Sequence, residues 1–318
     1  MNVPVVDLSP VRTGEGDLQQ LVGDIDAACR DTGFFAVVGH GIPLAARAAA
    51  FNAAREFFDL PLEAKEEIAI GRSSAHRGYV ALEAETLQPD LGADAKEAID
   101  IGLELPPDHD ALQDGQGVHG PNQWPELEGF REAVLAYYAL ALDAAMVTLR
   151  AIALALELRP GFFDRRMRLP MCNLRMLHYP PVPTPNDDRL GCGAHSDYGT
   201  ITLLATDDEP GLELRRRDGT WTSVAAPPDA LVVNLGDLLA RWTNGRYVST
   251  VHRVISPTER HRYSIPFFVN PDAETVVSPV RSCVDADHPD LDEPITARDY
   301  LLSRFDDTHA YRSAEPAD

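Results

Sequence analysis

The residues best suited to chemistry are a histidine and an aspartate two positions apart, His195 and Asp197, followed by an alternating run of Thr, Ile and Leu. In an extended chain, residues i and i+2 point to the same side, so the imidazole and the carboxylate can bind one metal ion together. His252, on another predicted strand, is the best candidate for a third ligand. Two histidines and one carboxylate leave coordination positions open, as in the non-haem Fe(II) sites that activate O2. The spacing therefore predicts an Fe(II) site, and we interpret nearby Cys192 as a small buried residue rather than a ligand.

Arg262 and Ser264 lie on the predicted strand 261–269, ten residues beyond His252. The segment before this strand is typical of a turn, so strand 247–255 is expected to pair with it as an antiparallel hairpin, with His252 opposite Ser264. The metal ligand, the guanidinium and the hydroxyl would then share one face. An inward arginine is costly unless it meets an anion, and a guanidinium binds a carboxylate through two parallel hydrogen bonds. Arg262 is therefore expected to bind a ligand carboxylate, and the alternative is a buried salt bridge within the protein.

The elements that must position these residues differ between the two halves of the chain. Helical periodicity predicts helices over 17–31, 43–58, 61–68 and 126–158, with an irregular stretch over 69–125. After about residue 171 short strands dominate, and Asp218-Gly219 is typical of a hairpin turn. We predict a mainly β fold with flanking helices: a double-stranded β-helix (distorted jelly roll) core with an α-rich N-terminal half.

Four regions follow from this pattern. They are an N-terminal region of helices, a strand and substrate-covering loops (1–125), a long supporting helix (126–170), the jelly-roll core (171–275), and a C-terminal lid segment and tail (276–318).

Composition excludes several classes of function. The chain has 318 residues, 44% of them hydrophobic, and a formal net charge of −22, which is typical of a soluble globular protein and disfavours nucleic acid as a partner. Its four cysteines are widely spaced without a CxxC motif, so a reduced, cytoplasmic setting is expected. We expect no membrane partner, because no run of about 20 apolar residues occurs.

Taken together, these motifs resemble the isopenicillin N synthase-like family of Fe(II)/2-oxoglutarate-dependent oxygenases. His195-x-Asp197, His252 and Arg262-x-Ser264 match its motifs residue for residue. Further similar segments occur at 3–8, 33–35, 40–42, 57–65, 178–181, 234–237 and 242–245. The likeness covers roughly residues 3–270.

The resemblance implies that His195, Asp197 and His252 hold the iron and that 2-oxoglutarate chelates it. The co-substrate would form a salt bridge to Arg262, with Ser264 and Tyr179 assisting. The implied reaction uses O2 to convert 2-oxoglutarate to succinate and CO2 while a small-molecule metabolite is hydroxylated, desaturated or cyclised. A monomer or weak homo-oligomer is expected. Plant members usually have Asn where this chain has Leu177, so contacts to the chelating end of the co-substrate are expected to differ.

Two alternatives stay open. One is an oxidase of the same fold that does not use 2-oxoglutarate, in which Arg262 and Ser264 hold a substrate carboxylate. The other is a metal-free scaffold that binds a small molecule without catalysis.

The primary substrate is expected to enter through the segments that cover the barrel mouth. Within the irregular cover, Arg77 and Tyr79 offer one cationic and one aromatic contact, a mixture typical of small-molecule pockets. Phe268, on the strand of Arg262, is expected to form an apolar wall. The alternative for Arg77 is a solvated surface charge.

Overall fold

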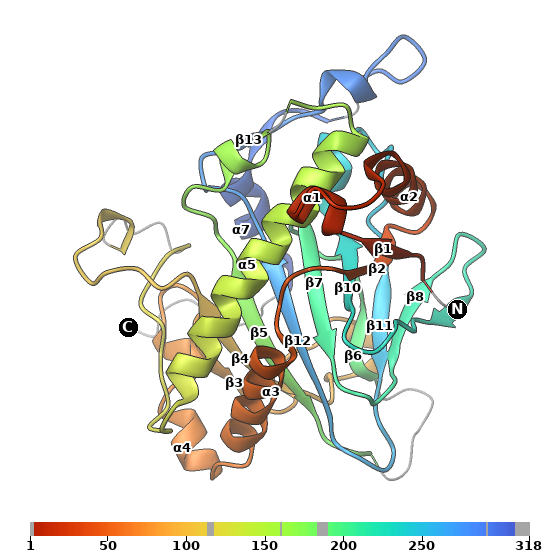
Figure 1. Ribbon diagram of the computed structural model, residues 1–318. Helices are drawn as coiled ribbons and strands as arrows, with labels where there is room; N and C mark the ends of the chain where they lie inside the picture. Colours follow the sequence, from red (N-terminus) through yellow and green to blue (C-terminus); the bar gives the residue numbers. More distant parts are fainter. Residues whose placement is uncertain (1–2, 113–117, 160, 183–189, 291, 309–318) are drawn as a thin grey trace.

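The architecture is known from a computed structural model, which describes residues 3–112, 118–159, 161–182, 190–290 and 292–308. Two β-sheets carry the core (Figure 1). The large sheet has eight strands in the order β1 (Val5–Asp7), β2 (Phe34–Val38), β10 (Leu231–Leu235), β7 (Ile201–Thr206), β12 (Arg262–Val269), β5 (Asn173–Tyr179), β4 (Glu97–Gly102) and β3 (Gly78–Val80). The small sheet has four: β6 (Leu190–His195), β11 (His252–Ile255), β8 (Leu212–Arg215) and β9 (Trp221–Ser223).

The inner faces of the two sheets meet in a shared cluster of buried residues. Leu177 of the large sheet belongs to the same cluster as Leu214 and Val254 of the small one. Strands of the N-terminal region extend the large sheet at both edges, because β1 and β2 lie at one end and β3 and β4 at the other. The predicted regions therefore share one sheet.

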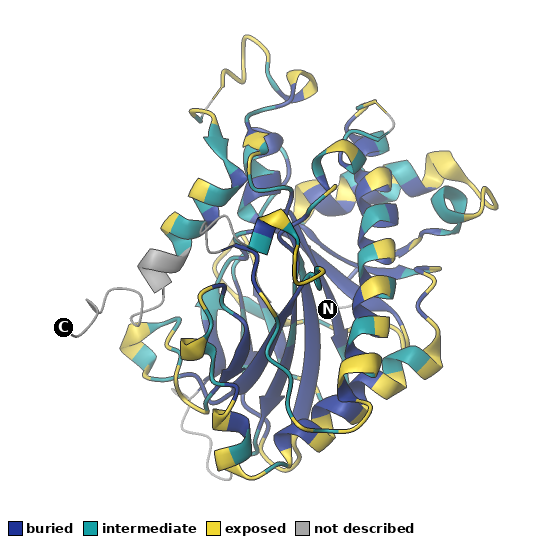
Figure 2. Ribbon diagram, turned by 90° about the vertical axis from the view of Figure 1, so that its left-hand side faces the viewer, coloured by how far each residue is buried: buried dark blue, intermediate teal, exposed yellow. Residues whose placement is uncertain are grey.

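Helices pack around the sheets, and the longest of them covers the outer face of the large sheet. The helices are α1 (Ser9–Arg12), α2 (Leu18–Asp31), α3 (Leu44–Phe58), α4 (Leu62–Glu66), α5 (Phe130–Ala155), α6 (Asp237–Trp242) and α7 (Ala297–Thr308). Figure 2 shows the strands as a buried layer, with the exposed sides of the helices turned away from it. A short two-stranded sheet of β13 (Val276–Val277) and β14 (Ile295–Thr296) precedes α7.

The long helix α5 is a core helix by its contacts. By length and composition it is apolar enough to cross a membrane. It packs against α2, α3 and β12, and residues such as Val134, Ala141 and Ile152 are fully buried in the main hydrophobic cluster. Its apolar surface is thus used for packing on the large sheet.

The predicted hairpin between strands 247–255 and 261–269 is wrong. Strand β11 pairs with β6 and β8 in the small sheet, whereas β12 pairs with β5 and β7 in the large one. The chain between them crosses from one sheet to the other, and Pro257 accepts a hydrogen bond from the backbone of Val182 instead of closing a turn. His252 and Ser264 therefore line one cavity from different sheets and are not paired along one ladder.

Strand β6 was missed from the sequence, while the hairpin at Asp218-Gly219 is confirmed. Strand β6 contains Gly191 and Gly193, and because glycine is rare in strands, the sequence of this segment does not predict one. Gly191 is needed because a Cβ there would lie 2.8 Å from the ring of Tyr179. Strands β8 and β9 pair across the predicted turn, where Gly219 has φ +85°.

Candidate metal and co-substrate site

A cavity of about 230 Å³ lies between the two sheets and contains most of the predicted site residues. His195 ends β6, Asp197 follows it, and His252 begins β11. The Nε2 atoms of His195 and His252 lie 3.7 and 3.8 Å from Oδ1 of Asp197. One donor atom from each residue lies within 4.8 Å of the other two. The donor set fits one divalent ion with open positions.

Outer hydrogen bonds fix the orientation of all three side chains. Nδ1 of His195 lies 2.8 Å from the carbonyl of Gly193, and Nδ1 of His252 lies 3.1 Å from that of Thr250. A carbonyl oxygen only accepts hydrogen bonds, so Nδ1 carries the proton in both rings, and each Nε2 presents its lone pair on the side of Asp197.

The carboxylate is fixed in the same manner. Oδ2 of Asp197 accepts hydrogen bonds from Asn234 Nδ2 at 2.6 Å and from the hydroxyl of Thr202. This leaves Oδ1 facing the two imidazoles.

Electrostatics keep His252 and Asp197 in the protonation states that bind metal. Burial, together with nearby His195, lowers the pKa of His252 to about 4, so its imidazole is neutral at pH 7. Burial alone would raise the pKa of Asp197, but the two histidines and its two hydrogen-bond donors hold it below the usual value. A neutral imidazole and an ionised carboxylate are the forms that coordinate a metal.

Arg262 is a buried cation that forms no ion pair among the described residues. It is 1% exposed, and its Nε and Nη1 have no hydrogen-bond partner among the described residues. Its guanidinium carbon lies 4.8 Å from the ring centroid of Tyr179, and Ser264 lines the same cavity. In the described parts of the chain no carboxylate forms an ion pair with it, so the expected alternative of an internal salt bridge is not found. A guanidinium left open in this manner fits a ligand carboxylate.

Leu177 also lines the cavity, on the same strand as Tyr179. An apolar side chain stands there, and it offers no hydrogen bond to a bound co-substrate.

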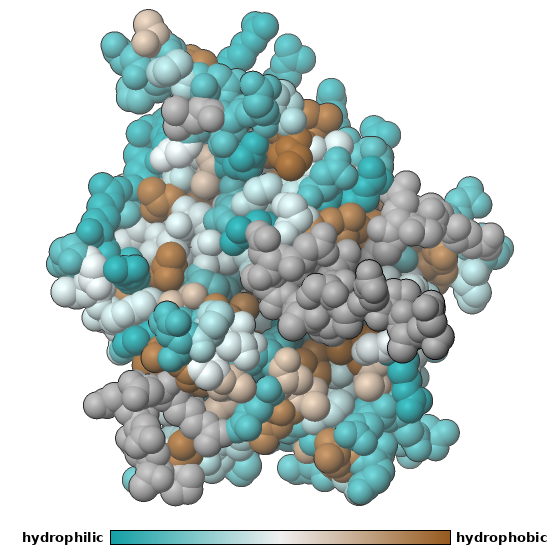
Figure 3. All heavy atoms as spheres, turned by 180° about the vertical axis from the view of Figure 1, so that it is seen from behind, coloured by the Kyte–Doolittle hydropathy of each residue, from teal (hydrophilic) through white to brown (hydrophobic). Residues whose placement is uncertain are grey.

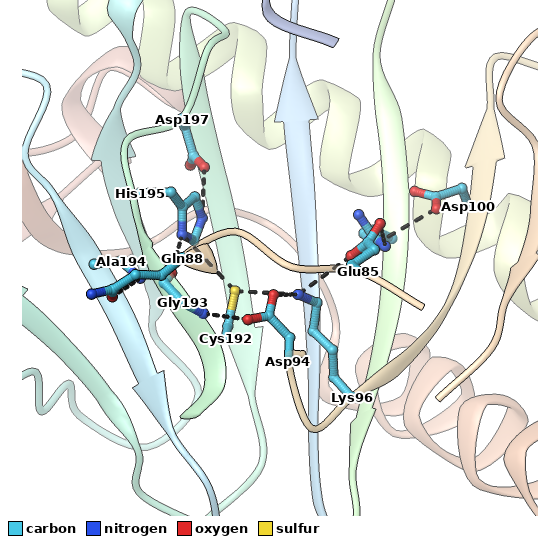
Figure 4. A network of polar contacts seen from close by, with 11 residues as sticks. Glu85, Gln88, Asp94, Lys96, Asp100, Cys192, Gly193, Ala194, His195 and Asp197 are labelled. Atoms are coloured by element: carbon cyan, nitrogen blue, oxygen red, sulfur yellow. Dashed lines mark hydrogen bonds and ion pairs between the residues drawn. The ribbon is translucent and has the colours of Figure 1, made fainter. Parts of the chain in front are cut away.

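A polar network ties the cover segment to the strand of the first metal ligand (Figure 4). Asp94 accepts hydrogen bonds from the backbone of Gly193 at 2.9 Å and from Lys96. Lys96 lies 3.6 Å from the sulfur of Cys192, which itself is 3.9 Å from Nδ1 of His195. Because that nitrogen faces away from Asp197, Cys192 stands outside the metal site, as expected.

Sequence reasoning missed this network, although a clue was present. Asp94 and Lys96 place charges just before a strand whose residues are all buried, and Asp100 places one within it. Charges at buried positions are rarely tolerated without partners.

Two of the three expected substrate contacts line the cavity, and one does not. Arg77 and Phe268 are part of its wall. Tyr79 instead packs in the helix-side cluster, 6.0 Å from the ring of Phe57, and its hydroxyl donates to Glu97 at 2.6 Å. Tyr79 faces away from Arg77 because Gly78 between them, with φ +111°, breaks the regular alternation of an extended strand.

The C-terminal segment also reaches this site. Leu301 of α7 lines the cavity, and the hydroxyl of Tyr300 donates to Asp237 at 3.1 Å. Asp237 in turn accepts from Ser196, between the first two metal-ligand candidates, at 3.3 Å.

Comparison with known proteins identifies the family. Residues 3–127 match the model described as non-haem dioxygenase in morphine synthesis N-terminal, and residues 170–271 match that of the 2OG-Fe(II) oxygenase superfamily. The chain is 37% identical to the 2-oxoglutarate-Fe(II) type oxidoreductase hxnY of Emericella nidulans, over 98% of this chain and 91% of the relative. The chain belongs to the 2OG-Fe(II) oxygenase superfamily.

Solved structures agree with this membership. This 2OG-Fe(II) oxygenase superimposes on a putative 2OG-Fe(II) oxygenase family protein from Caulobacter crescentus with a TM-score of 0.85 and 34% identity, over 96% of this chain and 98% of the other. A Neurospora crassa protein, solved in complex with alpha-KG and thymine, gives a TM-score of 0.84 and 30% identity over 96% of both chains. These likenesses confirm the jelly-roll fold. They give no support to the alternatives of a metal-free scaffold or an oxidase without 2-oxoglutarate.

Proposed function

We propose that this 2OG-Fe(II) oxygenase, of the isopenicillin N synthase-like branch, holds Fe(II) through His195, Asp197 and His252. We further propose that it binds 2-oxoglutarate through Arg262, Ser264 and Tyr179. One observation carries the proposal: the uncompensated guanidinium of Arg262 lies in the same cavity as the three metal-ligand candidates. A dicarboxylate that reaches from the metal to Arg262 would coordinate the metal through one carboxylate and pair with the guanidinium through the other.

With O2 and 2-oxoglutarate, Fe(II) supplies the oxidation of a substrate C–H bond, with release of succinate and CO2. The protein contributes binding and orientation. Arg262 holds the distal carboxylate, while Ser264 and Tyr179 orient it. Apolar walls such as Leu204 and Val254 keep water from the reacting atoms. The outcome is hydroxylation, desaturation or cyclisation of a small-molecule metabolite.

The size of the cavity and the net charge of the protein indicate which other partners it binds. A cavity of about 230 Å³ is smaller than most drug-sized sites, which supports a small substrate. The net charge of −22 opposes binding to nucleic acid or to anionic lipid. Figure 3 shows one face on which hydrophilic residues predominate and hydrophobic ones form separate small groups. We propose a cytoplasmic monomer or weak homo-oligomer that works without nucleic acid or membrane.

The experiment is anaerobic titration with Fe(II) and 2-oxoglutarate, followed by an aerobic assay for succinate. We expect about one Fe(II) per chain, and loss of both metal binding and succinate formation in His252→Ala. His288→Ala is the matched control, because that side chain is 73% exposed. Normal Fe(II) affinity and succinate formation in His252→Ala would contradict the assignment.

A further inference from the structure

A row of paired residues crosses the large sheet beneath the cavity. Gly102 of β4 is paired with Asn173 of β5, which is paired with Phe268 of β12. Phe268 is in turn paired with Thr202 of β7, and Thr202 with Asn234 of β10. The row thus runs from the β4 edge to the two side chains that donate hydrogen bonds to Asp197.

The guanidinium of Arg77 lies at the far end of this row, directly over Gly102. A Cβ built on Gly102 would lie 2.0–2.3 Å from three of its atoms, so the absence of a side chain makes room for the cation. Arg77 is 6% exposed and lines the cavity. Its Nη1 and Nη2 donate to the carbonyls of His76 and Val118 at 3.0 and 3.3 Å.

The guanidinium of Arg77 feels the charge of Asp100 but forms no ion pair with it, and Asp100 is shared with Arg175. Nε of Arg77 has no hydrogen-bond partner, and the side chain forms no ion pair in the described parts of the chain. Burial lowers the pKa of its guanidinium, which reflects the cost of holding the charge there. The alternative of a solvated surface charge is excluded by this burial.

Other charged groups on the cavity wall are already committed to each other. Arg175 pairs with Glu85 at 2.7 Å and with Asp100 at 3.6 Å. Lys96 pairs with Glu85 at 3.3 Å and with Asp94. Among the described residues, the lysines and arginines that line the cavity and form no ion pair with a carboxylate are therefore Arg77 and Arg262.

We propose that the primary substrate is a small carboxylic acid whose carboxylate binds Arg77 while its oxidised carbon lies toward Asp197, over the opposite end of the row. This inference rests on the proposed function, because it places the chemistry at the metal. Phe268 stands between the two ends and contacts the apolar middle of the substrate.

The row also sets a length. From β4 to β7 there are three strand spacings, or about 14 Å. The substrate therefore carries its carboxylate several bonds away from the carbon that is oxidised. Acids whose only oxidisable carbon is next to the carboxylate are too short.

The experiment uses the full-length enzyme with Fe(II) and saturating 2-oxoglutarate under anaerobic conditions. The probes are ω-phenylalkanoates from phenylacetate to phenylhexanoate and the matching primary amides, titrated calorimetrically. We expect the longer acids to bind about tenfold or more tightly than their amides, the value of one charge-assisted contact. We expect phenylacetate to show no such preference.

Two variants test whether Arg77 causes the preference for an acid over its amide. Arg77→Gln should abolish it, and Gly102→Ala should weaken it although the charge is kept, because the new methyl displaces the guanidinium. Arg150→Ala is the control, a surface arginine paired with Asp164. Thermal melts verify that each variant folds.

The outcomes separate the two proposals. If wild type binds Fe(II) and 2-oxoglutarate but no acid is preferred over its amide, or if Arg77→Gln keeps the preference, the carboxylate subsite is wrong and the proposed function stands. If wild type binds neither Fe(II) nor 2-oxoglutarate, the proposed function itself fails.

Discussion

Buried polar groups lie on both faces of the large sheet, and the two faces differ in how well those groups are satisfied. On the helix side, Glu97 accepts from Lys65 at 2.8 Å and from Tyr79 at 2.6 Å, and its other oxygen lies 2.7 Å from Nδ1 of His178. The other ring nitrogen of His178 lies 2.7 Å from His261. We call these five residues the Glu97 cluster.

On the cavity side, Nε of Arg77 and both Nε and Nη1 of Arg262 have no hydrogen-bond partner among the described residues. Buried polar groups are nearly always hydrogen-bonded, and leaving one unsatisfied is costly. A closed network such as the Glu97 cluster therefore indicates a structural role, whereas an open one indicates a place for a ligand. A substitution in the Glu97 cluster should therefore lower the stability of the fold, whereas a substitution of a cavity arginine should lower ligand affinity.

The largest effect is expected for Glu97→Gln. It leaves the cation of Lys65 buried without its carboxylate, so the free energy of unfolding should fall by about 3 kcal/mol. Denaturant titration measures the loss. The KM for 2-oxoglutarate should stay at the wild-type value, and a large rise in it would break the contrast between the two faces.

The same cluster gives a pH dependence with a definite sign. Burial by itself would raise the pKa of Glu97, but hydrogen bonds from His178, Lys65 and Tyr79 lower it below the usual value. The folded state therefore holds the proton less tightly than the unfolded state does. This contribution to stability is present above pH of about 4.3, the unfolded value, and is lost as the pH falls through the folded pKa. Unfolding of Glu97→Gln, followed over the same range, should lack this acid-dependent part.

Arg262→Leu should have the converse effect. It removes the proposed charged contact to 2-oxoglutarate, worth roughly 1.5–3 kcal/mol, so the apparent KM should rise by about one to two powers of ten. Because the cation forms no ion pair with a carboxylate among the described residues, the melting temperature should not fall. A variant with unchanged 2-oxoglutarate dependence would assign Arg262 to another ligand.

The smallest effect is expected for Tyr79→Phe. The change removes one hydrogen bond to Glu97 and should cost about 1 kcal/mol of stability. KM values for both substrates should be unaffected, because the ring packs among the helices. A selective loss of substrate affinity would return Tyr79 to the pocket.

Local pattern predicted the site better than it predicted the connections. Alternation within one strand was enough to place Arg262 and Ser264 on the same side, and the motif spacing found all three metal-ligand candidates. Which strands pair is set by tertiary packing. The sequence after β11 is typical of a turn whether the chain folds back into a hairpin or crosses to the other sheet. A single positive φ at Gly78 was enough to turn Tyr79 away from Arg77. The glycines of β6 concealed a strand whose small residues are required by neighbouring side chains.

Strand β12 carries residues of both the proposed co-substrate site and the proposed substrate wall. Arg262 and Ser264 occupy its beginning, and Phe268 lies near its end, six residues after Arg262. In the proposed site, a substitution at Phe268 changes the wall that faces the substrate without replacing Arg262 or Ser264. Selection can therefore alter which metabolite is oxidised while the oxidising machinery stays intact, so that one scaffold serves many substrates in the course of evolution.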